Sequence, residues 1–221
     1  MPPWLQLMAD SFWSLLSAGL QFTVPLAILS FVLGLALGIL VALIRLYGPK
    51  PLKWVADFYV WVIRGTPLLV QLFLIFYGLP NAGITLDAFP AALIGFTLNV
   101  GAYSSEIVRG AILSVANGQW NAAASLGMNR RQTLRWVIIP QSIFVSIPPL
   151  SNTFISLIKD TSLAAVITVP EMFLAAQRIV SVTYEPLILY VEAALIYLLF
   201  STVLSKLQTR LETYYQRHIP H

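Results

Sequence analysis

Three polar side chains lie on one expected helical face of the apolar segment 89–108. Asn99, Tyr103 and Glu106 are spaced i, i+4 and i+7, which places them on the same side of a helix. Polar and ionisable groups are costly in such surroundings and usually face a cavity or a partner, so they are candidates for lining the path of a polar solute. The structural alternative is that Asn99 and Tyr103 make interhelical hydrogen bonds while Glu106 pairs with Arg109.

A second candidate is the polar run Lys159-Asp160-Thr161-Ser162, which follows another apolar segment. Asp160 or Thr161 is expected to cap a helix that restarts at Leu163, and a broken helix can direct backbone donors at a carboxylate. Asp160 would then meet an amino group and Lys159 a carboxylate. Alternatively, the two charges neutralise each other and hold the break.

The third candidate is Arg64-Gly65-Thr66-Pro67, about ten residues into the apolar stretch 54–79. If the part before Gly65 lies along the membrane interface, Arg64 reaches the lipid phosphates; if it crosses the membrane, Arg64 needs an acidic partner. We expect a structural or gating role for these four residues.

Other chemistry finds no support in the sequence. There is no phosphate-binding Gly-rich loop ending in Gly-Lys-Ser/Thr, no cysteine and no plausible Ser, His and Asp arrangement. The two histidines, His218 and His221, stand in the C-terminal tail. We therefore expect no catalytic residues, no metal site and no cofactor bound by this chain.

Composition indicates an integral membrane protein. Of 221 residues, 58% are hydrophobic and 10% charged, with a mean hydropathy of +0.79. The net charge of +4 reflects cations gathered between apolar stretches, which favours membrane topology over nucleic-acid binding. A spanning helix needs about 20 apolar residues. This predicts one all-α domain, 1–221, with a short interfacial helix within 1–18 before the first span. The five predicted spans are 20–44, 54–79, 89–108, 137–158 and 186–204.

The cations alternate between the loops and so predict the orientation. Short cytoplasmic segments retain Lys and Arg, which places the N-terminus outside and the C-terminus inside. The predicted inner cations are Arg45, Lys50, Lys53, Arg109, Arg130, Arg131, Arg135, Lys206, Arg210 and Arg217. The predicted outer face carries Asp10, Asp87, Glu171 and Glu185, with Arg178 as its clear cation.

The largest inner loop, 109–136, contains a predicted short helix. Asn121 is expected to cap it, small residues follow, and Gly127 is expected to close it. Small side chains permit close docking of a partner, whereas a solvated loop helix under the bundle is the plainer interpretation. On the first span, Gly34 and Gly38 form a GxxxG pattern that predicts close helix contact.

The loop resembles the EAA loop of ATP-binding-cassette importer permeases, in the histidine, glutamine and cystine branch. The matching positions are Asn121-Ala122-Ala123, Gly127 and Ile138-Ile139-Pro140, with Asn121 where the family usually has Glu. The loss of that charge puts an ion pair with the ATPase in doubt, but not the docking. Three further segments are similar to this family: 64–71, 148–152 and 156–163. The run from Lys159 followed by Val169-Pro170-Glu171 looks most like cystine-type permeases.

The resemblance implies the type I importer permease fold in a bacterial inner membrane and translocation of a polar amino acid, with L-cystine as one candidate. It also implies a second permease subunit in a homo- or heterodimer, two cytoplasmic ATPase subunits that use ATP and Mg²⁺, and an extracytoplasmic amino-acid-binding protein. The residues expected to couple to the ATPase are Gln119, Asn121, Ala122, Ala123, Ser125, Leu126, Gly127, Met128 and Arg130.

Two other classes of protein are compatible with these apolar spans. A secondary transporter or channel would need no ATPase, but normally has more spans or an inverted repeat. A membrane scaffold would have little use for Asn99, Glu106, Lys159 and Asp160.

Overall fold

The computed structural model describes residues 2–216, so Arg217, His218 and His221 lie outside the described residues. The described part is all-helical, as predicted, and contains no strand. Its α-helices are α1 Pro3–Ala18, α2 Val24–Tyr47, α3 Lys50–Gly65, α4 Leu68–Phe73, α5 Ala88–Ser114, α6 Asn117–Ser125, α7 Arg130–Thr133, α8 Ile139–Asp160, α9 Met172–Thr183 and α10 Pro186–Gln216.

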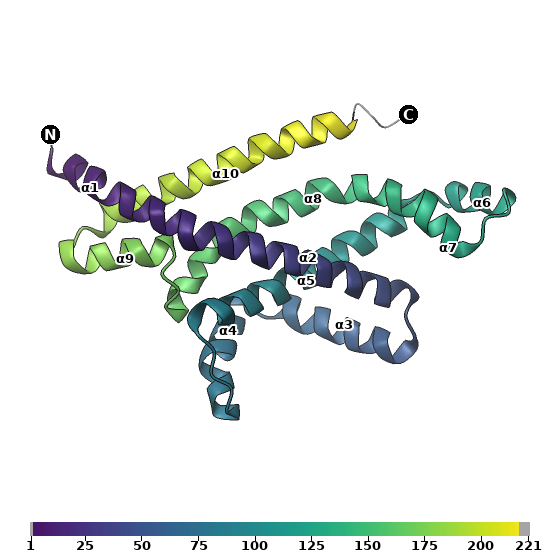
Figure 1. Ribbon diagram of the computed structural model, residues 1–221, viewed down its shortest axis with the longest axis horizontal. Helices are drawn as coiled ribbons and strands as arrows, with labels where there is room; N and C mark the ends of the chain where they lie inside the picture. Colours follow the sequence, from purple (N-terminus) through teal and green to yellow (C-terminus); the bar gives the residue numbers. More distant parts are fainter. Residues whose placement is uncertain (1, 217–221) are drawn as a thin grey trace.

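The first helix is longer than the predicted span. A π-helical turn, Gly19–Thr23, joins α1 to α2, so that Pro3–Tyr47 is one helix of 45 residues. Figure 1 shows the two helices as a single rod across the molecule. The short interfacial helix predicted within 1–18 is therefore not separate, because the π-helical turn continues the backbone hydrogen bonds through this junction.

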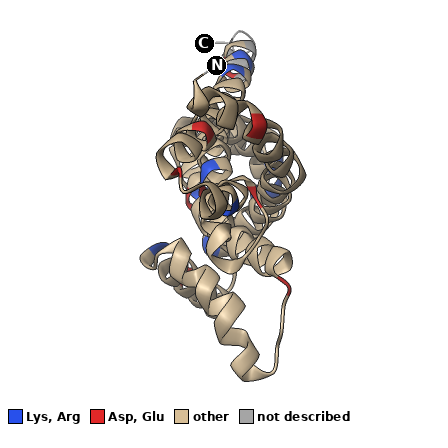
Figure 2. Ribbon diagram, turned by 90° about the vertical axis from the view of Figure 1, so that its left-hand side faces the viewer, with Lys and Arg blue, Asp and Glu red and all other residues tan. Residues whose placement is uncertain are grey.

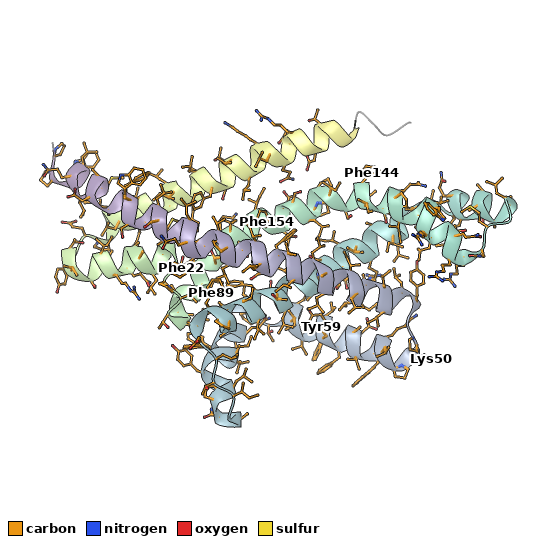
Figure 3. The ribbon with its side chains drawn as sticks, in the orientation of Figure 1. Phe22, Lys50, Tyr59, Phe89, Phe144 and Phe154 are labelled. Carbon is orange, nitrogen blue, oxygen red and sulfur yellow. The ribbon has the colours of Figure 1, made fainter. Side chains whose placement is uncertain are left out.

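Helices α2 and α5 form the closest packing in the fold. A Cβ at Gly34 would lie 2.6 Å from Cβ of Val100, and one at Gly38 would lie 2.7 Å from Cβ of Ser104. The GxxxG prediction is therefore confirmed. Around this contact the core is built from fully buried apolar residues of α2, α4, α5 and α8, among them Phe96. Phe154 of α8 packs on Phe31 of α2 with ring centroids 5.0 Å apart (Figure 3).

A sharp elbow separates α3 from α4. The two axes differ by 108°, and in Figure 1 α4 leaves the body of the molecule while α3 runs beside α2. Pro67 cannot continue α3, and the Gln71 amide holds the bend by donating to the carbonyl of Ile63 at 2.7 Å and to Oγ1 of Thr66 at 2.9 Å. Tyr59 fixes α3 to α5 through a 2.6 Å bond to the carbonyl of Leu98 (Figure 3).

A second break follows α8. A 3₁₀ segment, Thr161–Ile167, leads to α9, whose axis is bent by 51° from the preceding helix. The buried Glu171 caps α9 by accepting from the N–H groups of Phe173 at 2.8 Å and Leu174 at 2.7 Å. The hydroxyl of Tyr197 on α10 donates to the same carboxylate at 2.9 Å. This side chain therefore joins the break to α10.

Three helices in the described range are long and apolar enough to cross a membrane, and five if each bent pair counts as one span. The bent pairs are α3 with α4, and α8 with α9. Most of the ribbon in Figure 2 carries no charged residue, as a membrane location requires. The depth of these helices in a bilayer and the direction in which each crosses it stay predictions.

Candidate functional site

A cavity of about 490 Å³ brings together side chains from the elbow, α5 and α8. Its polar lining includes Thr66 beside Pro67, Asn99 and Tyr103 on α5, and Asp160 at the end of α8. Segments separated by almost a hundred residues thus meet around one space. Amide, hydroxyl and carboxylate groups against apolar walls can bind a small polar molecule.

The polar face predicted on α5 divides between two environments. Asn99 and Tyr103 line the cavity, and Tyr103 is 42% exposed. Glu106 is absent from the lining and lies in a charged network instead. Its Oε1 accepts from Nη1 of Arg45 at 2.5 Å, and its Oε2 accepts from Nη2 of Arg109 at 2.8 Å. Glu106 therefore pairs with Arg109, as the structural alternative predicted.

Arg64 reaches this network from the end of α3. Its Nη1 lies 3.6 Å from Oε1 of Glu106, and its guanidinium stacks 5.3 Å from the centre of the Tyr103 ring. The acidic partner that a membrane-embedded Arg64 requires is therefore present. Gly65 has open space around it, and Thr66 donates back to the carbonyl of Val62 at 2.9 Å.

The run 159–162 does not act as the predicted unit. Asp160 lines the cavity, whereas Lys159 and Ser162 line a different space of about 490 Å³ beside α10. Thr161 is buried and donates to the carbonyl of Ile158. No ion pair joins Lys159 to Asp160 in the described part of the chain.

The predicted helix restart at Leu163 is wrong. Asp160 ends α8 and neither it nor Thr161 caps a helix, because the chain continues directly into the 3₁₀ segment. The next α-helix begins at Met172 and its cap is Glu171. Leu163 therefore lies inside a continuous 3₁₀ segment and does not begin the new helix that the broken-helix hypothesis required.

Three polar lining residues were missed as site candidates, namely Asn152, Thr153 and Ser156. Asn152 and Ser156 lie on the cavity wall with Asp160, and all three follow at intervals of four along α8. That spacing puts them on one helical face and was readable in the sequence. Asn152 also accepts a 3.1 Å bond from Gln208 of α10 through its Oδ1.

The loop helix α6 begins earlier than predicted. Its first residue is Asn117, so Asn121 lies inside the helix and does not cap it. Ala116 therefore occupies the N-cap position one turn before the predicted start, and the prediction of an Asn121 cap is wrong. The Asn129 side chain instead caps α7 in a reciprocal pair with Gln132.

Gly127 closes α6, as predicted. Its φ is +77°, and the N–H groups of Gly127 and Met128 bond back to the carbonyls of Ala124 and Ala123 at 2.9 and 3.1 Å. Leu126 is 82% exposed at this end. Of the predicted coupling residues, Ala123 is buried, Met128 is half-buried, and the exposed ones are Gln119, Asn121, Ala122, Ser125, Leu126, Gly127 and Arg130.

Among the described residues, no group of three or more His, Cys, Asp or Glu side chains could hold a metal ion.

Comparison with known proteins gives concordant matches. Residues 34–215 match the family described as binding-protein-dependent transport system inner membrane component. The chain is 53% identical to the L-cystine transport system permease protein TcyB of Bacillus subtilis (strain 168), over 98% of this chain and 93% of that protein. It is 38% identical to the glutamine transport system permease protein GlnP of Escherichia coli (strain K12), covering 90% and 91%.

A solved structure agrees with this match. One chain of an amino acid ABC transporter crystallised with histidines superposes with a TM-score of 0.89 at 39% identity, covering 94% of this chain and 97% of that one.

Proposed function

Because this chain belongs to the family of binding-protein-dependent transport system inner membrane components, we propose that it conducts L-cystine along a path lined by the cavity between the elbow, α5 and α8. The chain is the permease subunit of an amino-acid ABC transporter and has the type I importer permease fold. The 53% identity to an L-cystine permease supports the solute. The main structural support for the path is that Thr66, Asn99, Tyr103 and Asp160 line the same cavity.

In this proposal the path lies between two permease subunits. Arg64, Thr66, Asn152 and Asp160 are exposed in the isolated chain, although polar side chains at membrane depth face a cavity or a protein partner. A second subunit would shield them from lipid and leave a polar route. Asp160 would receive a solute ammonium group, while Asn99 and Tyr103 would offer hydrogen bonds.

Energy would come from a separate cytoplasmic ATPase. The exposed end of α6, with Leu126 and Gly127, offers it a compact docking surface on the loop that connects α5 to α8. A movement of the ATPase would be transmitted to Tyr103 through α5 and to Asp160 through α8. An extracytoplasmic binding protein would deliver the solute at the opposite end, in a bacterial inner membrane, with the N-terminus outside and the C-terminus inside.

Reconstitution tests this function. Proteoliposomes containing the permease, its ATPase and its binding protein should take up radiolabelled L-cystine in a vanadate-sensitive reaction. Asp160→Asn should lower the rate by about tenfold or more, because one charge-assisted contact is lost. Glu185→Gln, an exposed change outside the cavity, should retain uptake. Wild-type uptake of another amino acid in place of L-cystine would correct the solute, and full activity of Asp160→Asn would refute the assigned path.

A further inference from the structure

We infer that Arg64 forms the carboxylate subsite of the solute path, at the end of the cavity nearest the α6 loop; this rests on the proposed function. The sequence pointed instead to Lys159 for that role. Lys159 faces the other space beside α10, whereas Arg64 stacks on Tyr103 and precedes the cavity residues Thr66 and Pro67 by two and three positions.

The network pairs Arg64 with Glu106 only at long range and leaves its hydrogen-bond donors unused. Oε1 of Glu106 is already engaged by Arg45 at 2.5 Å, and Oε2 by Arg109 at 2.8 Å. Arg64 stays 3.6 Å from Oε1, beyond hydrogen-bond distance, and makes no hydrogen bond within the described part of the chain. Its side chain is 44% exposed, against 15% for Arg45 and 34% for Arg109. A guanidinium with unused donors matches a carboxylate bidentately.

The position of Arg64 is fixed by its surroundings. The Gln71 amide braces the elbow immediately after it by donating to Ile63 and Thr66, and the Tyr103 ring supports the guanidinium from one side. Arg45 and Arg109 neutralise the nearby Glu106 carboxylate, which would otherwise repel an anion. A solute carboxylate could therefore bind Arg64 without rearrangement of the helices.

Opposite charges lie at the two ends of this path: Asp160 lines the cavity at one end, and Arg64, just outside the lining, stacks on Tyr103 at the other. Helix α5 runs toward the α6 loop and α8 runs away from it, so Tyr103 and Asn152 mark the near end and Asn99 and Asp160 the far end. The eight residues from Asn152 to Asp160 span about 12 Å of helix. This separation suits an extended solute that is charged at both ends. L-cystine has an ammonium and a carboxylate on each half, with Cα atoms about 5.5 Å apart across its disulfide.

A binding comparison between acid and amide tests the subsite. Radiolabelled L-cystine is bound at equilibrium to the purified permease–ATPase complex without the binding protein, and L-cystine diamide, which lacks the carboxylates, competes. We expect the wild type to prefer the acid. Arg64→Gln should weaken L-cystine binding by about tenfold or more and abolish this preference, while diamide affinity stays within about twofold and reports an intact cavity. The L-cystine affinity of Arg64→Lys should fall between those of the wild type and Arg64→Gln, because lysine keeps the positive charge but cannot bind a carboxylate bidentately.

Matched variants separate the role of Arg64 from a general loss of positive charge around Glu106. Arg109→Gln removes a different arginine from Glu106 and should leave the preference for the acid intact. The inference is overturned if Arg64→Gln or, should that complex fail to assemble, Arg64→Lys keeps the full preference, or if Lys159→Gln is the variant that loses it. If the wild type transports another amino acid, the solute proposal fails separately, and the same acid and amide comparison with that amino acid decides the role of Arg64.

Discussion

Arg45 on α2 and Glu106 on α5 form an ion pair with 2.5 Å between Nη1 and Oε1, and Nε of the same arginine donates to Asp57 on α3 at 2.6 Å. One guanidinium thus links three helices near the cavity between the elbow, α5 and α8. The side chains of Arg45 and Glu106 are 15% and 22% exposed, whereas that of Asp57 is 57% exposed. The two carboxylates therefore differ in how strongly solvent screens them.

Replacement of each carboxylate should reveal this difference. Glu106→Gln leaves partly buried arginines without their counter-charge and should lower the free energy of unfolding by about 3 kcal/mol. Asp57→Asn removes a screened pair and should cost under about 1 kcal/mol. Thermal unfolding of the purified permease in one detergent measures both. Equal losses would contradict the central position given to Glu106.

The glycines of α2 and α5 offer a steric test. Gly38→Ala places a methyl group 2.7 Å from Cβ of Ser104 and 2.9 Å from the carbonyl of Gly101, so the helices must separate. We expect a loss of about 1–3 kcal/mol. Gly110→Ala meets no atom within 4 Å and should gain up to about 1 kcal/mol from helix propensity. The prediction fails if both variants unfold at the same temperature.

The capping carboxylate at the second break should be coupled to α10. Glu171→Ala leaves the partly buried N–H groups of Phe173 and Leu174 unpaired and should cost about 2 kcal/mol. Tyr197→Phe removes one donor and should cost about 1 kcal/mol. In a double-mutant cycle the two losses should be non-additive by at least about 0.5 kcal/mol. Simple additivity would mean that the hydroxyl does not depend on the carboxylate.

A substitution at the exposed end of α6 should impair assembly with the ATPase but have little effect on folding. Leu126 is 82% exposed, so Leu126→Asp should leave the unfolding temperature unchanged but lower co-purification of the ATPase by about tenfold, as for an interface hot spot. Val182→Asp, which alters a 78% exposed side chain at the opposite end of the molecule, is the matched control and should retain the ATPase. Normal co-purification with Leu126→Asp would move the docking surface elsewhere.

Local patterns in the sequence predicted those features that depend on nearby residues. The helical class, the close approach at Gly34 and Gly38, and the positive φ of Gly127 each follow from hydropathy or backbone sterics. The contact of Glu106 with Arg109 is also local, since the two lie one turn apart. Its contact with Arg45 joins two helices and could not be read from spacing.

Errors arose where tertiary contacts determine the backbone. Pro67 marks a break, but the 108° angle depends on the side chain of Gln71 bonding across it. Asp160 is of a residue type that often caps helices. The chain instead enters a 3₁₀ segment packed against the core, and Glu171 caps the next helix. The separation of Lys159 from Asp160 likewise depends on which helices pack on either side of α8.

The uninterrupted first helix has a mechanical consequence. Pro3–Tyr47 is about 67 Å long at 1.5 Å per residue, more than twice the thickness of the hydrocarbon core. Its close contact with α5 at Gly34 and Gly38 lies between Thr23, which accepts from the N–H of Met172 at 3.3 Å, and Arg45, which pairs with Glu106. If this helix stays straight when one end is pushed, it would turn about that contact as a lever does. Rotation driven from the α6 side would therefore shift the α9 side in the opposite direction.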